Sequence, residues 1–96
     1  MDIRVLEIRL LPGDKATRAF CDIEIDGITI KDFRVMQNGR RAYVKAPFST
    51  YKNVTGEVCF RQIVDLPDEV RGQVDTAILS AFYRKKELSN GAQSQQ

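Results

Sequence analysis

The chain has no histidine, no tryptophan and only two cysteines among its 96 residues. Histidine is the usual general base of enzymes and the commonest metal ligand, so its absence argues against most catalytic and metal sites. Cys21 and Cys59 lie far apart in the sequence, and nothing in their spacing suggests a disulfide or a zinc site. We therefore expect no enzyme activity, no cofactor and no metal. Two thiols of this kind fit a reducing cytoplasm.

The glycines and serines also lack the neighbouring residues that would make a phosphate-binding loop or a catalytic serine. The early glycines stand alone at expected turns, so no glycine-rich phosphate loop follows a strand. Ser49 and Ser80 have no evident activating partner. Asp22, Glu24 and Asp26 alternate along one expected strand and could bind a cation, but a solvated sheet face explains them better.

Long apolar runs are absent as well. No stretch approaches the roughly 18 apolar residues that cross a bilayer, and no apolar run follows the opening residues 1–4. We therefore expect a cytoplasmic protein without a secretory signal or membrane insertion. The chain is 43% hydrophobic and 29% charged, which predicts one small globular domain. A domain of this size buries a modest share of its surface, so a second copy would help to complete its core.

Acidic residues are missing from one window. Between Asp32 and Glu57 there is none, although the net charge of the whole chain is only +2. The window holds five basic residues, Arg34, Arg40, Arg41, Lys45 and Lys52, and its aromatic residues include Tyr43, Phe48 and Tyr51. Basic side chains interleaved with aromatic ones are typical of surfaces that bind polyanions such as nucleic-acid backbones. A solvated loop and strand face is the alternative, and the window alone does not decide between the two.

Alternating hydrophobicity predicts five strands, at residues 3–11, 19–25, 28–36, 41–45 and 58–64. A phase switch in the first run predicts a bulge, or a strand covered on both faces. Asp26-Gly27 and Asn38-Gly39 predict tight turns after the second and third strands, and Pro47 ends the fourth. Residues 48–55 are expected to form a polar loop.

The period then changes to that of a helix. Apolar residues recur on one helical face: Val70, Val74, Ala77, Ile78, Ala81 and Phe82. Residues 1–88 are therefore predicted to form a single α+β domain, a mainly antiparallel five-stranded sheet followed by one C-terminal amphipathic helix. The polar residues 89–96 are predicted to be a disordered tail. One helix cannot cover both faces and both edges of such a sheet, so we expect a homodimer through strand edges or the bare face.

Several short stretches carry a family resemblance. Asp32–Val35 precedes a tight turn and Tyr43–Pro47, and Gly56-Glu57, Arg71–Leu79 and Phe82-Tyr83 follow downstream. This order and spacing resembles the SpoVG family, the bacterial stage V sporulation or septation regulators, from Ile3 to about Lys86. The resemblance implies a small dimeric protein that binds DNA, and in some members RNA. Such binding would regulate transcription in cell-envelope, cell-division and virulence programmes.

The family pattern is matched unevenly. Arg71 stands at the position of the family's helix arginine, in a helix that the resemblance implies contacts nucleic acid. Gln73 stands where members often have lysine, and residues 48–53 depart from a more basic or proline-bearing loop. These departures bear on specificity rather than on the fold. A role in sporulation does not follow, because the family extends beyond spore formers.

The nucleic-acid interpretation predicts phosphate contacts from eight residues: Arg40, Arg41, Lys45, Lys52, Arg71, Arg84, Lys85 and Lys86. Arginine suits phosphate because its planar fork donates two parallel hydrogen bonds. Residues 84–86 could instead only complement the helix dipole.

Three tyrosines could stack on unpaired bases, which would favour single strands or RNA loops. Tyr43 could equally be a half-buried strand residue and Tyr83 part of the helix packing, which leaves Tyr51 as the freest of the three.

A second interpretation of the whole chain belongs to a different class. It is a dimeric protein-interaction module that docks an acidic partner at the division apparatus.

Overall fold

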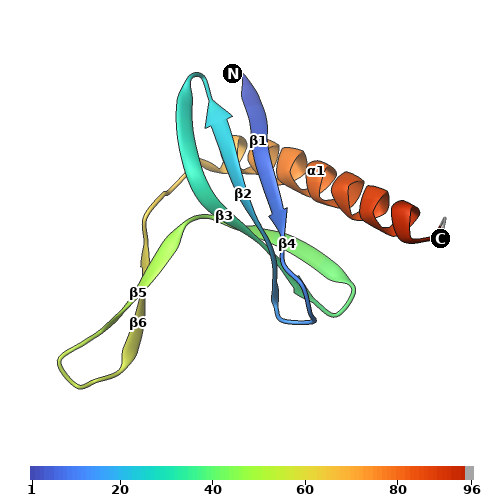
Figure 1. Ribbon diagram of the computed structural model, residues 1–96. Helices are drawn as coiled ribbons and strands as arrows, with labels where there is room; N and C mark the ends of the chain where they lie inside the picture. The colour runs from blue at the N-terminus through green and yellow to red at the C-terminus, as the bar shows by residue number, and fades with distance from the viewer. Residues whose placement is uncertain (95–96) are drawn as a thin grey trace.

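The computed structural model describes the backbone of residues 1–94 and the side chains of residues 1–88. In this part of the chain the elements follow the order β1 (Ile3–Leu10), β2 (Thr17–Ile25), β3 (Ile28–Asn38), β4 (Arg41–Lys45), β5 (Phe48–Lys52), β6 (Val58–Gln62) and α1 (Asp68–Ser94). Every strand pair is antiparallel. The predicted α+β class, with antiparallel strands before one C-terminal helix, is therefore confirmed (Figure 1).

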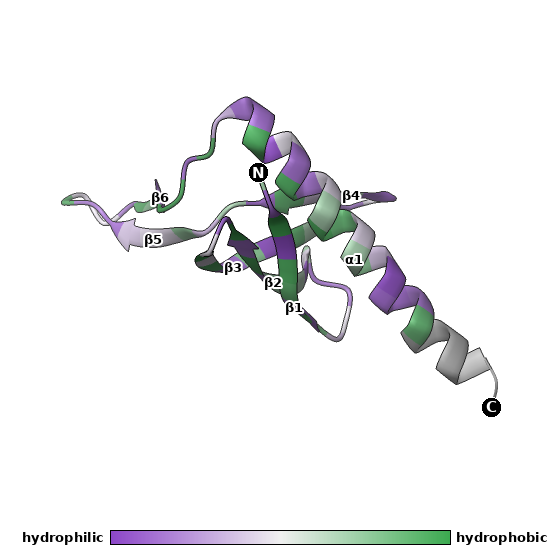
Figure 2. Cartoon of the chain, turned by 90° about the horizontal axis from the view of Figure 1, so that it is seen from above, coloured by the Kyte–Doolittle hydropathy of each residue, from purple (hydrophilic) through white to green (hydrophobic). Residues whose placement is uncertain are grey.

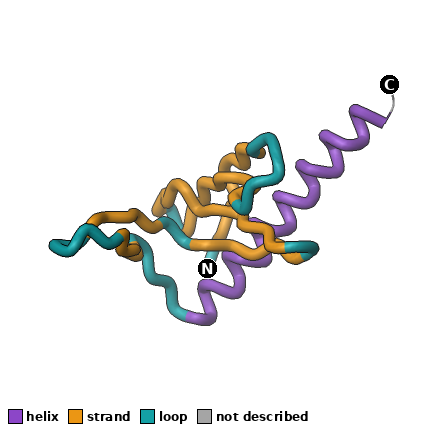
Figure 3. Tube along the Cα trace, turned by 90° about the horizontal axis from the view of Figure 1, so that it is seen from below, coloured by secondary structure: helices purple, strands orange, loops and turns teal. Residues whose placement is uncertain are grey.

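The strands form two sheets rather than the predicted single sheet of five. The main sheet has the order β1-β2-β3-β4, while β5 pairs only with β6. The polar loop expected at residues 48–55 is wrong in its first half, where Phe48–Lys52 forms β5. Pro47 lies between β4 and β5 and donates no ladder hydrogen bond, so the chain leaves the main sheet there. The hairpin of β5 and β6 projects away from the main sheet in all three views of the chain (Figures 1, 2 and 3).

A polar turn closes this hairpin. The side-chain oxygen Oδ1 of Asn53 accepts the backbone N–H groups of Thr55 and Glu57, each at 3.0 Å. Asparagine is favoured in such turns because its amide oxygen replaces a backbone acceptor. The sequence from Asn53 to Glu57 therefore reverses the chain and brings Val58 opposite Lys52.

The predicted turn at Asp26-Gly27 and the predicted bulge in β1 are both present. Asp26 and Gly27 have φ values of 48° and 88°, as a type I′ hairpin requires. In β1 the register with β2 shifts between Val5 and Glu7. A second irregularity lies in β3, where Asp32 has a φ of 67° and the register with β2 shifts.

The core lies between one face of the main sheet and α1. From the sheet it contains Ile8, Ala19, Cys21, Ile23, Phe33, Val35 and Val44. The helix contributes Val74, Ile78 and Phe82, which are spaced by four residues and therefore lie on one face of α1. In Figure 2 the hydrophobic residues of α1 and of the strands meet along this layer.

The predicted tail at residues 89–96 overlaps the end of α1, whose backbone is helical to Ser94. The side chains of residues 89–94 and the whole of residues 95–96 lie outside the described part, so disorder there stays a prediction. Within the described residues, α1 is too polar to be a candidate for crossing a membrane.

Candidate nucleic-acid interface

The face of the main sheet opposite α1 carries the central residues of the basic window. Residues that pair across antiparallel strands share a face, and Val35 and Val44 are buried on the helix side. Their neighbours Arg34 and Lys45 pair with each other, so both lie on the opposite face. Phe20 pairs with Arg34 and extends the same line into β2.

Cations and aromatic rings alternate along this line and into the hairpin. The guanidinium carbon of Arg34 lies 5.3 Å from the ring centroid of Phe20 and 4.2 Å from that of Phe48. Lys45 Nζ lies 4.8 Å from the ring of Phe48 and 5.6 Å from that of Phe60. We call Phe20, Arg34, Phe48, Lys45 and Phe60 the stacked row. Each exposed cation–aromatic contact contributes about 0.5–1 kcal/mol, so the row holds its cations in place without neutralising them.

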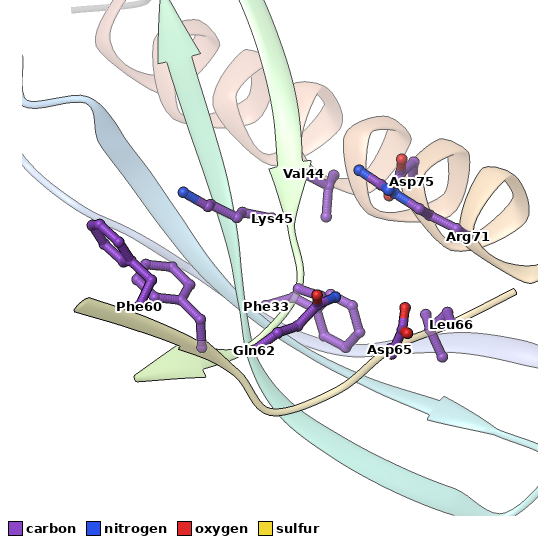
Figure 4. A pocket seen from close by; sticks show the side chains of 11 residues that line it. Phe33, Val44, Lys45, Phe60, Gln62, Asp65, Leu66, Arg71 and Asp75 are labelled. Atoms are coloured by element: carbon purple, nitrogen blue, oxygen red, sulfur yellow. The ribbon is translucent and has the colours of Figure 1, made fainter. Parts of the chain in front are cut away.

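A recess lies beside the stacked row, where β4, the hairpin and the start of α1 meet (Figure 4). We call it the junction pocket; its volume is about 410 Å³. Lys45 reaches it from β4, Phe60 from β6 and Arg71 from α1. The backbone N–H of Arg71 bonds to the carbonyl of Pro67 at 2.8 Å, which anchors this arginine in the first turns of the helix.

The junction pocket also contains two carboxylates, those of Asp65 and Asp75. Partial burial raises the pKa of Asp75, and the positive charge of Arg71, one helical turn earlier, opposes that rise. Within the described residues, neither carboxylate takes part in a salt bridge. The pocket thus offers two cations, two acceptors and an aromatic wall.

Ion pairing is concentrated around β1, at the opposite edge of the main sheet from β4. Among the described residues, every salt bridge involves Arg4 or Arg9 of β1, with acidic partners at Asp2 before β1 and on β1, β2 and β3. The hydrogen bond from Arg9 lowers the pKa of Asp22 and keeps that carboxylate charged. In the described residues, the cations of β4, β5 and the start of α1 form no such pairs. Salt bridges among the described residues therefore do not neutralise the positive charge of the window.

The structure brings together only some of the eight predicted residues. Lys45 and Arg71 line the junction pocket together. Arg41 begins β4 opposite Asn38, Arg40 lies in the turn before it, and Lys52 ends β5. These five side chains are all exposed.

The helix cluster at residues 84–86 lies elsewhere. A rise of 1.5 Å per residue places Arg84 about 20 Å from Arg71 along the helix axis. Lys85 Nζ donates a hydrogen bond to the backbone carbonyl of Ile8, and Lys86 Nζ lies 5.9 Å from the ring of Phe82. These two lysines therefore contact the protein itself, and the eight residues do not form one continuous basic surface.

The sequence interpretation missed the aromatic part of this site. Phe60 appeared to be an ordinary strand residue, yet its side chain is 68% exposed beside Lys45. Arg34 was noticed only as a member of the basic window. Its alternation with the buried Phe33 and Val35 was a signal that it faces away from the core. No local pattern could reveal that Phe48 lies between Arg34 and Lys45, because that depends on how the hairpin leaves the sheet.

The three tyrosines are all exposed, so Tyr43 is more open than the half-buried strand residue considered from the sequence. Tyr83 packs edge-on against Phe82, with ring centroids 5.3 Å apart, which fits its role in helix packing. Tyr51 and Phe60 border a further shallow recess on the hairpin with Ser49 and Arg61.

Comparison with protein-family models and with curated proteins finds no match to this chain. The resemblance to the SpoVG family therefore stays a prediction that rests on the residues quoted above. Within the described residues there is also no cluster of three or more side chains suited to hold a metal ion.

Proposed function

We propose that this chain is a nucleic-acid-binding regulatory protein that contacts DNA or RNA at the junction pocket and the stacked row. The observation that carries the proposal is the placement of Lys45 and Arg71. They come from different elements, meet at one recess and stay outside the salt bridges of the described residues. Arg40, Arg41 and Lys52 would contact flanking phosphates. Cations in this arrangement attract a polyanion by long-range electrostatics and by counterion release.

The regulatory part of the proposal rests on the SpoVG resemblance. A small protein of that family would act on gene expression in cell division, septation or envelope programmes, in the cytoplasm and without an enzymatic step. The stacked row supports the nucleic-acid part independently of the family, because it was identified from the geometry of the chain.

A homodimer is part of the same proposal. The hairpin makes little contact with the rest of the chain and exposes Val54, Val58 and Ile63 to solvent. Two-stranded hairpins are marginally stable alone, and exposed apolar side chains on one are protected when another surface packs on them. Sedimentation at low micromolar concentration should show a dimer, and Val58→Glu should shift it towards monomer. Monomer alone in the unchanged protein would contradict this part.

The direct test is a titration of the purified protein against single- and double-stranded DNA and RNA at 50 and 200 mM salt. Binding to at least one of them should weaken by more than tenfold at the higher salt, because phosphate contacts release counterions. Arg4→Ala is a matched control, since Arg4 already pairs with Glu24 at 2.8 Å. Absence of salt-dependent binding to all four would remove the proposal.

A second candidate function has one observation in its favour. The sheet face also contains a wide groove of about 630 Å³, whose lining includes the apolar residues Phe20, Ile30 and Ile63. Lys31 and Arg34 border it, so an acidic segment of a protein partner at the division apparatus would fit. A poly-glutamate peptide that binds more tightly than any nucleic acid at 200 mM salt would favour this alternative.

A further inference from the structure

The junction pocket has features that binding to a phosphate backbone alone does not require. Backbone contact needs exposed cations, but here Lys45 and Arg71 reach a recess that has Phe48 and Phe60 among its lining residues. A volume of about 410 Å³ lies in the range of pockets that hold small organic groups. The recess therefore has room for a small planar group.

Phe60 is the side chain best placed to stack on such a group. It is the most exposed of the three phenylalanine rings that line the pocket, and Phe48 supports it at a centroid distance of 5.8 Å and an interplanar angle of 57°. Lys45 Nζ stands 5.6 Å from its ring centroid, so a charge that attracts phosphate lies next to a surface that attracts a base. Proteins that bind single strands combine cations with aromatic platforms in this way.

The carboxylates of the pocket favour an unpaired base over a duplex. Asp65 and Asp75 are hydrogen-bond acceptors at the recess, and neither forms a salt bridge with a described residue. The amino and imino groups on the Watson–Crick edge of a base can donate hydrogen bonds to carboxylates. In a duplex those donors are already paired, whereas in a single strand they are open. Against a duplex backbone the two negative charges would only repel.

We infer that the junction pocket receives one unpaired base stacked on Phe60, with its neighbouring phosphates on Lys45 and Arg71, so that the chain prefers single strands to duplexes. This inference rests on the proposed function and narrows it to one class of nucleic acid. It assigns to Phe60 the stacking role that the sequence interpretation had considered only for tyrosines.

The chain has no tryptophan, so Phe60→Trp creates a single fluorescent reporter at the pocket. A mixed-sequence single-stranded DNA of about 20 nucleotides should quench its emission, because a stacked base lies against the indole. The matching duplex should quench it several-fold less at equal occupancy. Tyr83→Trp is the control, because Tyr83 is an exposed aromatic residue on α1 outside the pocket. Equal quenching at both positions, or by both nucleic acids, would overturn the inference.

Affinity supplies an independent measurement. Phe60→Ala and Phe60→Leu should each weaken single-strand binding by about 5- to 150-fold, the effect of losing one base–aromatic stack. Leucine keeps the apolar side chain that a dimer contact would use, so a loss with Phe60→Leu isolates stacking. Tyr83→Ala should change the affinity by less than twofold. Because Phe60 is exposed, both Phe60 variants should keep the unfolding temperature of the unchanged protein.

The two possible failures are distinguishable. If the unchanged protein binds no nucleic acid in a salt-dependent manner, the proposed function itself is wrong. If it binds single strands and duplexes equally, and Phe60→Leu binds both as well as the unchanged protein does, the proposed function stands and only the pocket inference falls.

Discussion

Arg9 forms two parallel hydrogen bonds with the carboxylate of Asp22: Nη1 donates to Oδ2 at 2.9 Å and Nη2 to Oδ1 at 3.2 Å. The same carboxylate accepts the backbone N–H of Asp32 at 3.1 Å. This pair therefore ties β1 and β2 to the irregular point of β3, where Asp32 has a φ of 67°. The irregularity directly precedes Phe33 and Arg34. It therefore determines that Phe33 points into the core, while Arg34 points to the opposite face of the sheet and joins the stacked row.

Asp22→Asn should destabilise the fold by about 1.5–3 kcal/mol, since charge-assisted hydrogen bonds contribute that much. The amide keeps an acceptor for Asp32 but loses the negative charge that Arg9 requires. Chemical denaturation measures the change. Glu24→Gln is the matched control, because the exposed pair of Glu24 and Arg4 should contribute less than about 1 kcal/mol. An equal effect of the two substitutions would contradict the role given to Asp22.

The same pair predicts a pH dependence of stability. In the folded protein, the hydrogen bond from Arg9 lowers the pKa of Asp22 below the value of about 3.9 that an aspartate has in an unfolded chain. The unfolded chain therefore binds a proton first as the pH falls, and the stabilisation by Asp22 is lost below about pH 4. Unfolding free energies measured from pH 6 to pH 2 should fall less steeply in Asp22→Asn. Parallel curves would show that Asp22 is not responsible.

Phe82 lies at the end of the buried stripe of α1 and is 2% exposed. Phe82→Ala should cost about 3–5 kcal/mol, because it removes a buried ring and leaves a cavity between α1 and the sheet. The neighbouring Tyr83→Ala should cost much less, since Tyr83 is exposed. Thermal unfolding of the two variants compares them directly. Similar losses would mean that α1 does not pack on the sheet as described.

Substituting alanine at two glycines should change the stability of the fold in opposite directions. Neither Gly27 nor Gly72 would bring an added Cβ within 4 Å of another atom, so only backbone conformation decides. Gly27 has a φ of 88°, where alanine is strained, and Gly27→Ala should destabilise by about 1–2 kcal/mol. Gly72 lies inside α1, and Gly72→Ala should stabilise by about 0.5–1 kcal/mol. A destabilising Gly72→Ala would argue against the helical backbone at this position.

The main sheet and the helix could be predicted because their patterns are local. Alternation of apolar residues and the Asp26-Gly27 turn define the second and third strands, and the four-residue spacing of Val74, Ile78 and Phe82 defines α1. The strand β5 could not be predicted in the same way. Its residues are polar except for Phe48 and Tyr51, because most of the hairpin stays in contact with solvent.

Of the candidate site, only the charged residues could be predicted from the sequence. Lys45 and Arg71 were both expected from the sequence, but nothing there indicated that they meet at one pocket. Their meeting depends on where α1 starts relative to the edge strand β4, which is set by long-range packing. Arg84 and Lys86 were also expected to contact phosphates, yet the length of α1 separates them from the pocket.

The most direct test of the account is the slope of log affinity against log salt for a single-stranded DNA. Each phosphate contact adds about 0.7 to its magnitude, so Lys45→Ala combined with Arg71→Ala should reduce it by about 1.4. Arg84→Ala combined with Lys86→Ala removes the same charge from the far part of α1 and should leave the slope unchanged. Equal reductions in both double variants would contradict a binding site centred on the junction pocket.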